Sequence, residues 1–266
     1  MSMVTAVFGW TGRISLNGLY AACRVCLLVV STFDWILVRP LRGQGLRVRS
    51  TLLHLVEFGA HSFPVVGLVC FLVGAIMAMQ ASYQLSRFGA QQFIADLVSV
   101  AAMRELAPLM TAVLVTGRCG SAIAAEIGSM KVAEEIDALE VMGIHPIRFL
   151  VAPKFLAMLI SVPALTMLAT FVMIGGGYLL ATAVVGIEPG LYLERTANAL
   201  QMKDFSTGLV KSVFFALVIC WVGVYRGFQV EGGAEGVGRM TTSSVVTSIF
   251  WIVVVDMMFT VFFYFL

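Results

Sequence analysis

The chain has 266 residues, of which 60 % are hydrophobic and only 12 % are charged, and its formal net charge is +2. Soluble domains carry about 25 % charged residues, so the composition excludes an ordinary soluble domain. Four long stretches contain no Asp, Glu, Lys or Arg, namely 58–86, 155–187, 212–225 and 240–255. A bilayer core needs about 20 mainly apolar residues in a helix, and the apolar residues are continuous rather than alternating. We therefore predict an all-α integral membrane protein.

Five transmembrane helices are predicted in chain order from these stretches and their borders. They are expected at about Leu53–Met79, Leu97–Gly117, Phe155–Val185, Phe205–Tyr225 and Ser243–Leu266. Basic residues in the connecting segments set the orientation of such a bundle, because Lys and Arg are retained in the cytoplasm. Twelve of them fall on the side of the N-terminus and four on the other side. The N-terminus is thus expected in the cytoplasm and the C-terminus at the opposite face.

Residues 1–50 are expected to form a separate N-terminal region before a transmembrane domain at 51–266. The stretch Leu19–Val38 is apolar enough to suggest a sixth span, but Arg24 and Asp34 interrupt it. Trp and Tyr alternate with arginines in this region, a mixture typical of an amphipathic helix that lies in the membrane interface. We favour the interfacial helix over the sixth span.

An acidic segment, Glu126–Gly143, separates the second and third predicted spans. It holds five of the fifteen acidic residues of the chain together with one lysine, which gives it a net charge of −4. The charged residues are Glu126, Lys131, Glu134, Glu135, Asp137 and Glu140. Such a segment cannot enter the lipid and must face water or a partner protein.

The acidic segment has the periodicity of a short amphipathic helix. One apolar stripe, at spacings of four, three and four residues, consists of Val132, Ile136, Leu139 and Gly143. The opposite side carries Glu134, Asp137 and Glu140. This pattern predicts a helix on the cytoplasmic surface. Helices that bind the anionic leaflet usually present basic residues, so the acidic face favours a basic partner protein, with an ordinary solvated helix as the alternative.

Small residues recur every four positions just before and within the acidic segment. The two rows are Gly117, Ser121 and Ala125, and Gly120, Ala124 and Gly128. Small residues at this spacing allow helices to approach closely. We expect tight packing that joins the second span rigidly to the acidic helix.

Arg104 and Glu105 lie near the middle of the second predicted span, and Asp256 lies inside the last one. Charges at this depth are costly and usually face a polar cavity or one another. Adjacent helical residues do not face each other, so Arg104 and Glu105 are expected to have separate partners, and Asp256 is a candidate partner for Arg104. The group is either a structural pair or part of a polar wall along a substrate path.

Gln80 and Tyr83 lie near the predicted end of the first span, close to Gln84 and Arg87. Amide, phenol and guanidinium groups together could bind a lipid headgroup. The same residue types also occur in the belt of side chains at the membrane–water interface, so both interpretations stay open.

The sequence contains no combination of residues typical of catalysis or of a metal site. Cys23 and Cys26 have redox or zinc spacing but lack a second ligand pair. The glycine-rich loop 232–238 is not followed by the Gly-Lys-Ser/Thr of a phosphate-binding loop. We expect no catalytic residue, no metal and no cofactor on this chain, and any ATP must be hydrolysed by another subunit.

The central motifs resemble the MlaE (YrbE, or toluene-tolerance Ttg2B-like) permease family. The matching runs are Arg104–Pro108, Gly117–Arg118, Ala124–Met130, Glu134–Gly143 and Pro146. The resemblance extends over about residues 50–266 and implies an ABC transporter permease of the bacterial inner membrane. Members move phospholipids or related lipids between this membrane and the periplasm or outer membrane, which helps to maintain lipid asymmetry there.

The resemblance also implies partners and roles. Members act as homodimers with an ATPase dimer similar to MlaF, which binds ATP and Mg²⁺, and with a ring of MCE-domain subunits similar to MlaD. A small STAS-domain protein similar to MlaB is a further candidate, and no nucleic acid is expected. The segment 126–143 resembles the coupling helix that docks into the ATPase, where we place Glu126, Gly128, Lys131, Glu134, Glu135, Asp137 and Glu140. The lipid path is expected to include Gln80, Tyr83, Arg104, Glu105 and Asp256.

Two other classes of function stay open from the sequence. One is an ion-coupled secondary transporter or channel, in which Arg104, Glu105 and Asp256 form a proton or ion relay. The other is a membrane scaffold that only anchors soluble partners. A secondary transporter would be driven by an ion gradient, whereas an ABC permease depends on ATP. In a scaffold, neutralising Arg104 or Glu105 would leave lipid transport unchanged.

Overall fold

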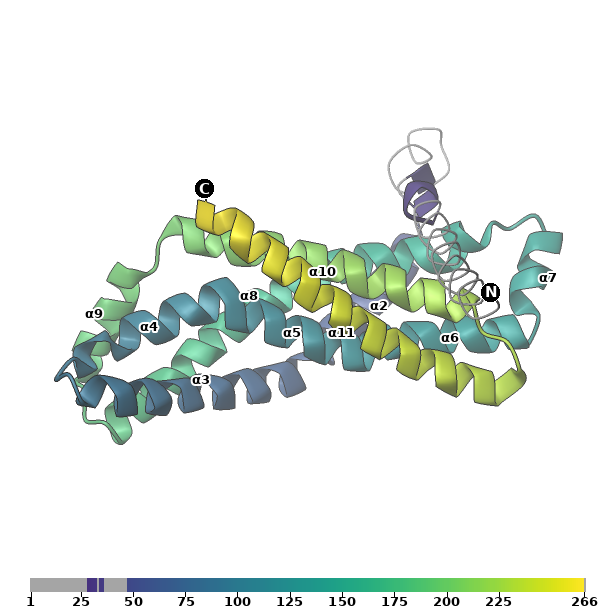
Figure 1. The fold of residues 1–266 in the computed structure, drawn as a ribbon. Coiled ribbons are helices and arrows are strands. Elements are labelled where there is room, and N and C mark those ends of the chain that lie inside the picture. Colours follow the sequence, from purple (N-terminus) through teal and green to yellow (C-terminus); the bar gives the residue numbers. More distant parts are fainter. Residues whose placement is uncertain (1–27, 33, 36–46, 266) are drawn as a thin grey trace, which may run out of the picture.

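The computed structural model describes residues 28–32, 34, 35 and 47–265 (Figure 1), and within these residues it contains helices and turns but no strand. Among the described residues, five helical segments are long and apolar enough to cross a membrane. They are Val48–Ser86, Gln91–Val132, Ile147–Ala183, Met202–Phe228 and Gly233–Phe265. The predicted all-α architecture with five spans is confirmed. The interfacial helix expected at Leu19–Val38 lies largely outside the described residues.

Several membrane-crossing segments are assembled from shorter helices joined end to end. The first consists of α2 (Val48–Leu55), the π-turn η3 (Val56–Ala60) and α3 (Phe63–Ser86). The second consists of η4 (Gln91–Phe93), α4 (Ile94–Ala101), η5 (Ala102–Leu106), α5 (Ala107–Val115), η6 (Thr116–Gly120) and α6 (Ser121–Val132). The rest of the chain forms α7 (Glu135–Val141), η7 (Ile147–Val151), α8 (Ala152–Ala183), α9 (Pro189–Ala199), α10 (Met202–Phe228) and α11 (Gly233–Phe265).

The helix α8 lies inside the bundle, where it packs against α2, α3, α5 and α10. Two glycines permit its closest approach to α3. A Cβ atom on Gly176 would lie 2.1 Å from the carbonyl oxygen of Phe71, and one on Gly74 would lie 1.9 Å from that of Met173. Both distances are far below van der Waals contact, so only glycine allows the two backbones to meet here.

The small residues before the acidic segment pack against α10. Gly120 and Ala124 are buried, and a Cβ on Gly120 would lie 3.2 Å from the side chain of Ile219. A Cβ on Gly227 of α10 would in turn lie 3.2 Å from the carbonyl oxygen of Ala124. Gly117 differs from the expectation, because it is exposed and open space surrounds its Cβ position.

Residues Arg104 and Glu105 lie in the π-turn η5, within the second membrane-crossing segment. Pro108 follows in the first turn of α5. Proline lacks the N–H that would continue the helix ladder, and π-turns shift side chains around the helix axis, frequently at functional sites. This turn lets neighbouring side chains reach different helices.

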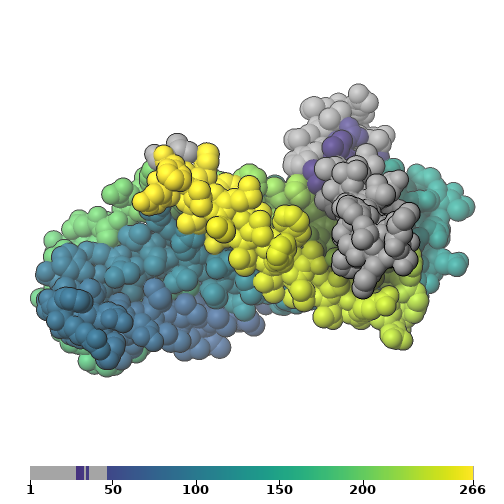
Figure 2. Space-filling model, in the orientation of Figure 1, coloured from purple at the N-terminus to yellow at the C-terminus, as the bar shows by residue number. Residues whose placement is uncertain are grey.

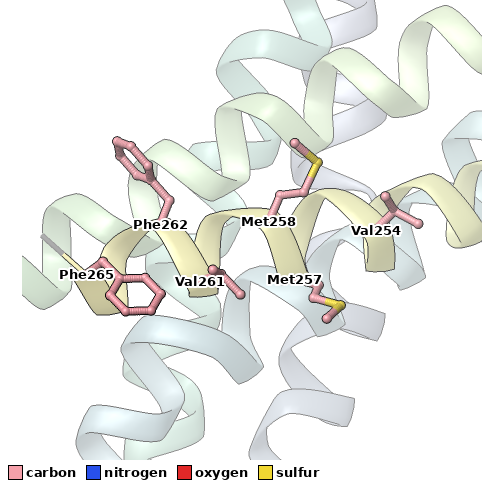
Figure 3. Close-up of a pocket in the computed structure, with 6 residues that line it drawn as sticks. All are labelled: Val254, Met257, Met258, Val261, Phe262 and Phe265. Carbon is pink, nitrogen blue, oxygen red and sulfur yellow. The ribbon is translucent and has the colours of Figure 1, made fainter.

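The bundle is elongated, with α9 and the α3–α4 connection at one end and α7 with the α10–α11 connection at the other (Figure 1). The helix α11 runs obliquely along the surface (Figure 2). Only 11 % of its most apolar stretch is buried, against 39–56 % for the other four segments. An open groove of about 610 Å³ runs along its outer face, lined by Met257, Met258, Val261 and neighbouring apolar residues (Figure 3).

Candidate functional site

Lys211 is the centre of a charged cluster inside the membrane-spanning part of the bundle. Its ammonium group lies 2.5 Å from Oε2 of Glu105, 2.9 Å from Oδ1 of Asp256 and 2.8 Å from Oγ1 of Thr260. The side chain of Lys211 has no exposed surface. The cluster therefore joins three membrane-crossing segments through one lysine.

The helix α11 contributes two members of the cluster because Asp256 and Thr260 are four residues apart and share one face. The Thr260 hydroxyl can donate to Oε1 of Glu105 at 3.1 Å or to the carbonyl oxygen of Asp256 at 2.9 Å. The carboxylates of Glu105 and Asp256 thus share one ammonium, and the Thr260 hydroxyl adds a donor for Glu105. A charge at this depth is tolerated only when it is paired and hydrogen-bonded, and these contacts provide that pairing.

Arg104 does not pair with Asp256, so that expectation is wrong. Its guanidinium lies 3.5 Å from Oδ1 of Asp204, whose other oxygen accepts a hydrogen bond from the backbone N–H of Gln201 at the start of α10. Successive helical residues point roughly 100° apart, and Arg104 consequently reaches the first turn of α10. Arg104 and Glu105 do have separate partners, as expected.

The cluster is open on one side. The side chains of Arg104 and Glu105 are 37 % and 35 % exposed, whereas those of Asp256 and Lys211 are 16 % and 0 % exposed. Two opposite charges are therefore accessible from outside the chain at membrane depth, and the remaining members hold them in place.

Lys211 was not identified as a site residue from the sequence: it falls inside the predicted span Phe205–Tyr225 but was one of the four basic residues assigned to the side opposite the N-terminus. The structure places it within α10, two turns after Asp204. Four buried residues of α10 share one face of the helix, because three of them follow Asp204 at intervals of three, four and seven residues: Thr207, Gly208 and Lys211. That helical periodicity, just before an uncharged run, is the signal that could have identified it.

Gln80 and Tyr83 lie apart from this cluster. Both are exposed on α3, and Tyr83 accepts a hydrogen bond of 2.6 Å from Arg87 one turn later. Among the described contacts, neither residue has a hydrogen bond or an ion pair with the cluster. The structure thus brings Glu105 and Asp256 together through Lys211, places Arg104 beside them, and leaves Gln80 and Tyr83 elsewhere.

The acidic segment is not one helix. The helix α6 ends at Val132, Glu134 adopts a left-handed conformation with φ of +58°, and α7 begins at Glu135. The left-handed residue redirects the chain because a right-handed helix cannot continue through it. Of the predicted apolar stripe, Ile136 and Leu139 are buried, whereas Val132 is 41 % exposed.

An ion pair with α8 holds the acidic segment against the bundle, and another ion pair lies within the segment. Glu126 on α6 accepts a hydrogen bond of 2.7 Å from Lys154 of α8, and Lys131 contacts Asp137 of α7 at 3.2 Å. Glu134, Glu135 and Glu140 are exposed and have no ion pair among the described residues. The surface of the segment therefore presents unpaired carboxylates, whereas Glu126 serves an internal contact.

The Lys154 contact extends to the first membrane-crossing segment. The lysine ammonium lies 3.4 Å from Nε2 of His54, whose Nδ1 lies 3.2 Å from a carboxylate oxygen of Glu57. Arg118 donates to the carbonyl oxygen of Glu57 at 2.9 Å and to the hydroxyl of Ser62 at 2.7 Å. The acidic segment is thus tied to α2, η3 and α8 at one end of the bundle.

Comparison with known proteins identifies the family. Residues 51–262 match the family model described as permease MlaE. A probable ABC transporter permease protein of Rickettsia typhi is 35 % identical over 87 % of this chain and 90 % of its own length.

Two further relatives have more specific names. The intermembrane phospholipid transport system permease protein MlaE of Haemophilus influenzae is 34 % identical over 71 % of this chain and 72 % of its own length. The chloroplastic protein TRIGALACTOSYLDIACYLGLYCEROL 1 of Arabidopsis thaliana is also 34 % identical, over 86 % of this chain and 65 % of its own length. With five membrane-crossing helices and a match over most of its length, the chain belongs to the MlaE permease family.

Proposed function

We propose that this protein is the permease subunit of an ABC transporter that moves phospholipid or a related lipid between the inner membrane and the periplasm or outer membrane. Such transport would help to maintain the lipid asymmetry of the outer membrane. The relative from Haemophilus influenzae carries a name of this kind. ATP, with Mg²⁺, would be hydrolysed by a partner subunit, because the sequence has no ATP-binding motif.

The partly exposed charges of Arg104 and Glu105 at membrane depth are the observation that carries the proposal. Transfer of a lipid headgroup through an apolar medium is costly unless polar groups replace its water. A guanidinium and a carboxylate side by side can contact the phosphate and the positively charged part of a headgroup. Gln80 and Tyr83 would act at a different point of the path, on the exposed side of α3.

The surface of α7 and the end of α6 is the proposed ATPase docking site. Exposed Glu134, Glu135 and Glu140 supply negative charge for a basic partner surface, while buried Ile136 and Leu139 anchor the short helix. Gly128 is buried beneath this surface, where a Cβ would lie 2.6 Å from the side chain of Val230. Movement of the docked ATPase would therefore be transmitted to α6 and to the connection between α10 and α11, where Val230 lies.

The proposed assembly is a homodimer with an ATPase dimer on the cytoplasmic side and an MCE-domain ring on the periplasmic side. A STAS-domain protein is a further candidate partner. The apolar outer face of α11 is the candidate dimer surface, because this span is the least buried of the five. In the sequence-based topology, twelve basic residues lie on the side of the N-terminus and four on the other side, which supports a cytoplasmic N-terminus. This asymmetry remains when Lys211 is counted within the membrane.

Reconstitution with the ATPase subunits tests this function. Proteoliposomes that contain the complex should transfer a fluorescent phospholipid when ATP is supplied, and Glu105→Gln should reduce transfer while the complex still assembles. Transfer or ion flux that the permease alone catalyses down an ion gradient would instead support a secondary transporter, in which the Glu105, Lys211 and Asp256 cluster relays protons. Unchanged lipid transfer after neutralisation of both Arg104 and Glu105 would favour the scaffold.

A further inference from the structure

A second polar site lies at the end of the bundle that carries α7. It is a cavity of about 540 Å³ lined by Trp35, Arg47, Gly143, Ile144, His145, Arg148 and Phe149. Arg47 directly precedes α2, and Arg148 lies in η7, so the cavity forms where the first and third membrane-crossing segments begin. It is separate from the charged cluster around Lys211, which lies within the spans.

The lining has the chemistry of an oxyanion site. It contains two arginines and one histidine, and no carboxylate belongs to the described lining. The guanidinium of Arg47 lies 3.9 Å from the ring centre of Phe149, and that of Arg148 lies 5.6 Å from the ring centre of Trp35. Stacking on a ring uses the face of a guanidinium, so the N–H edge of Arg47 can still donate to a phosphate or carboxylate.

Arg47 is the more accessible of the two arginines. It is exposed, and its contact with Phe149 is not accompanied by an ion pair in the part of the chain that the structure describes. Trp35 is 6 % exposed and its ring centre lies 5.2 Å from that of His145. The cavity thus has an aromatic floor and a positively charged rim.

The position of the cavity indicates the source of the anion. Three apolar residues of α2, the helix that follows Arg47, are exposed: Val48 by 62 %, Leu52 by 57 % and Leu53 by 65 %. Such a surface belongs in contact with acyl chains, which places the rim of the cavity at headgroup level. Basic pockets at this level on the cytoplasmic side attract anionic lipids.

We propose that this cavity binds the phosphate of an anionic phospholipid headgroup in the leaflet next to α7. The cytoplasmic identity of this leaflet rests on the proposed orientation, but the binding chemistry does not. The bound lipid would bridge the start of α2 and the segment that leaves α7. Lipid composition would thereby affect how firmly the proposed docking surface is held against the membrane.

Lipid titration of the purified full-length chain tests the site without any ATPase. The protein is stripped of lipid in detergent, and binding of phosphatidylglycerol, phosphatidylcholine and inorganic phosphate is compared by native mass spectrometry. Phosphatidylglycerol should bind in preference to phosphatidylcholine. Arg47→Gln should weaken this binding about tenfold, as expected for the loss of a charge-assisted contact. Arg49→Gln is the matched control, because Arg49 is exposed two residues away and does not line the cavity.

Several outcomes distinguish this site from the proposed lipid path and from other ligands. Glu105→Gln should leave the Arg47-dependent binding unchanged even if it abolishes transport, so the two proposals can fail separately. Arg148→Gln should weaken binding in the same direction as Arg47→Gln. Equal effects of the Arg47 and Arg49 variants, or equal binding of the two phospholipids, would overturn the proposal. Displacement of phosphatidylglycerol by low millimolar inorganic phosphate would overturn the lipid source and identify a soluble phosphate ligand.

Discussion

Lys154, buried in α8, donates a hydrogen bond of 2.7 Å to Glu126, whose side chain is about half exposed on α6. This contact connects α6, which contains the first part of the acidic segment, to the centre of the bundle. Removal of Glu126 would leave a buried ammonium with His54 as its other described contact, which is costly because unpaired buried charges are poorly tolerated.

We expect Glu126→Gln to lower the melting temperature more than the double variant Glu126→Gln with Lys154→Met. The single variant keeps the buried ammonium of Lys154 but removes the carboxylate that pairs with it. The double variant removes both charges, so no buried charge is left without its partner. A coupling free energy of about 1 kcal/mol or more is expected, since half of the Glu126 side chain is exposed to water. Thermal unfolding of the four proteins in one detergent measures this cycle, and strictly additive changes would contradict the coupling.

Reversal of charge on α7 should prevent ATPase docking. Glu135→Lys with Asp137→Lys adds positive charge to the exposed surface of the segment, and we expect the ATPase no longer to co-purify while the permease still inserts. The control is Glu188→Lys with Glu194→Lys, two exposed carboxylates near α9 at the opposite end. Normal ATPase recovery with the α7 variant would refute docking at this surface.

Lys211→Met should severely destabilise the protein. Two carboxylates, Glu105 and Asp256, would lose their shared ammonium, and the loss of one partner from a buried ion pair costs about 3–5 kcal/mol. Neutralisation of both carboxylates, as Glu105→Gln with Asp256→Asn, should restore much of the lost stability but not lipid transfer. Yield and melting temperature give the first result, and the proteoliposome assay gives the second. A stable Lys211→Met protein would show that the cluster contributes little to folding.

Gly176→Ala should separate α3 from α8. The new methyl group would lie 2.1 Å from the carbonyl oxygen of Phe71, so the backbones must move apart. Overpacking of this kind costs about 1–3 kcal/mol, and a lower melting temperature is expected. Gly175→Ala is the matched control in the adjacent position, where open space surrounds the Cβ. Similar melting temperatures for the two variants would mean that this close approach does not limit stability.

Cysteine cross-linking tests the proposed dimer surface. Met257 is 69 % exposed on the outer face of α11, and Leu168 of α8 is 49 % exposed on a different helix. In a chain without its five native cysteines, Met257→Cys or Val261→Cys should form dimers with a short bifunctional maleimide in membranes. Leu168→Cys should form far fewer. The opposite preference would move the dimer contact from α11 to α8.

The membrane class, the five spans found among the described residues and the acidic segment could all be predicted from the amino-acid sequence. Uncharged runs of helical length indicate membrane-crossing helices in a chain with this hydropathy. The family motifs could likewise be recognised from the order of residues between Arg104 and Pro146, and the family match confirms that recognition.

Which charged residues pair with one another could be seen only once the helices were packed together. Asp256 pairs with Lys211 rather than Arg104, and Glu126 pairs with Lys154 rather than facing a partner alone. Partners in an ion pair come from helices far apart in the sequence, and their contact depends on the rotation and depth of each helix. Periodicity identifies the face of one helix but not the face of the neighbouring helix that it meets, so these pairings could not be predicted from the sequence.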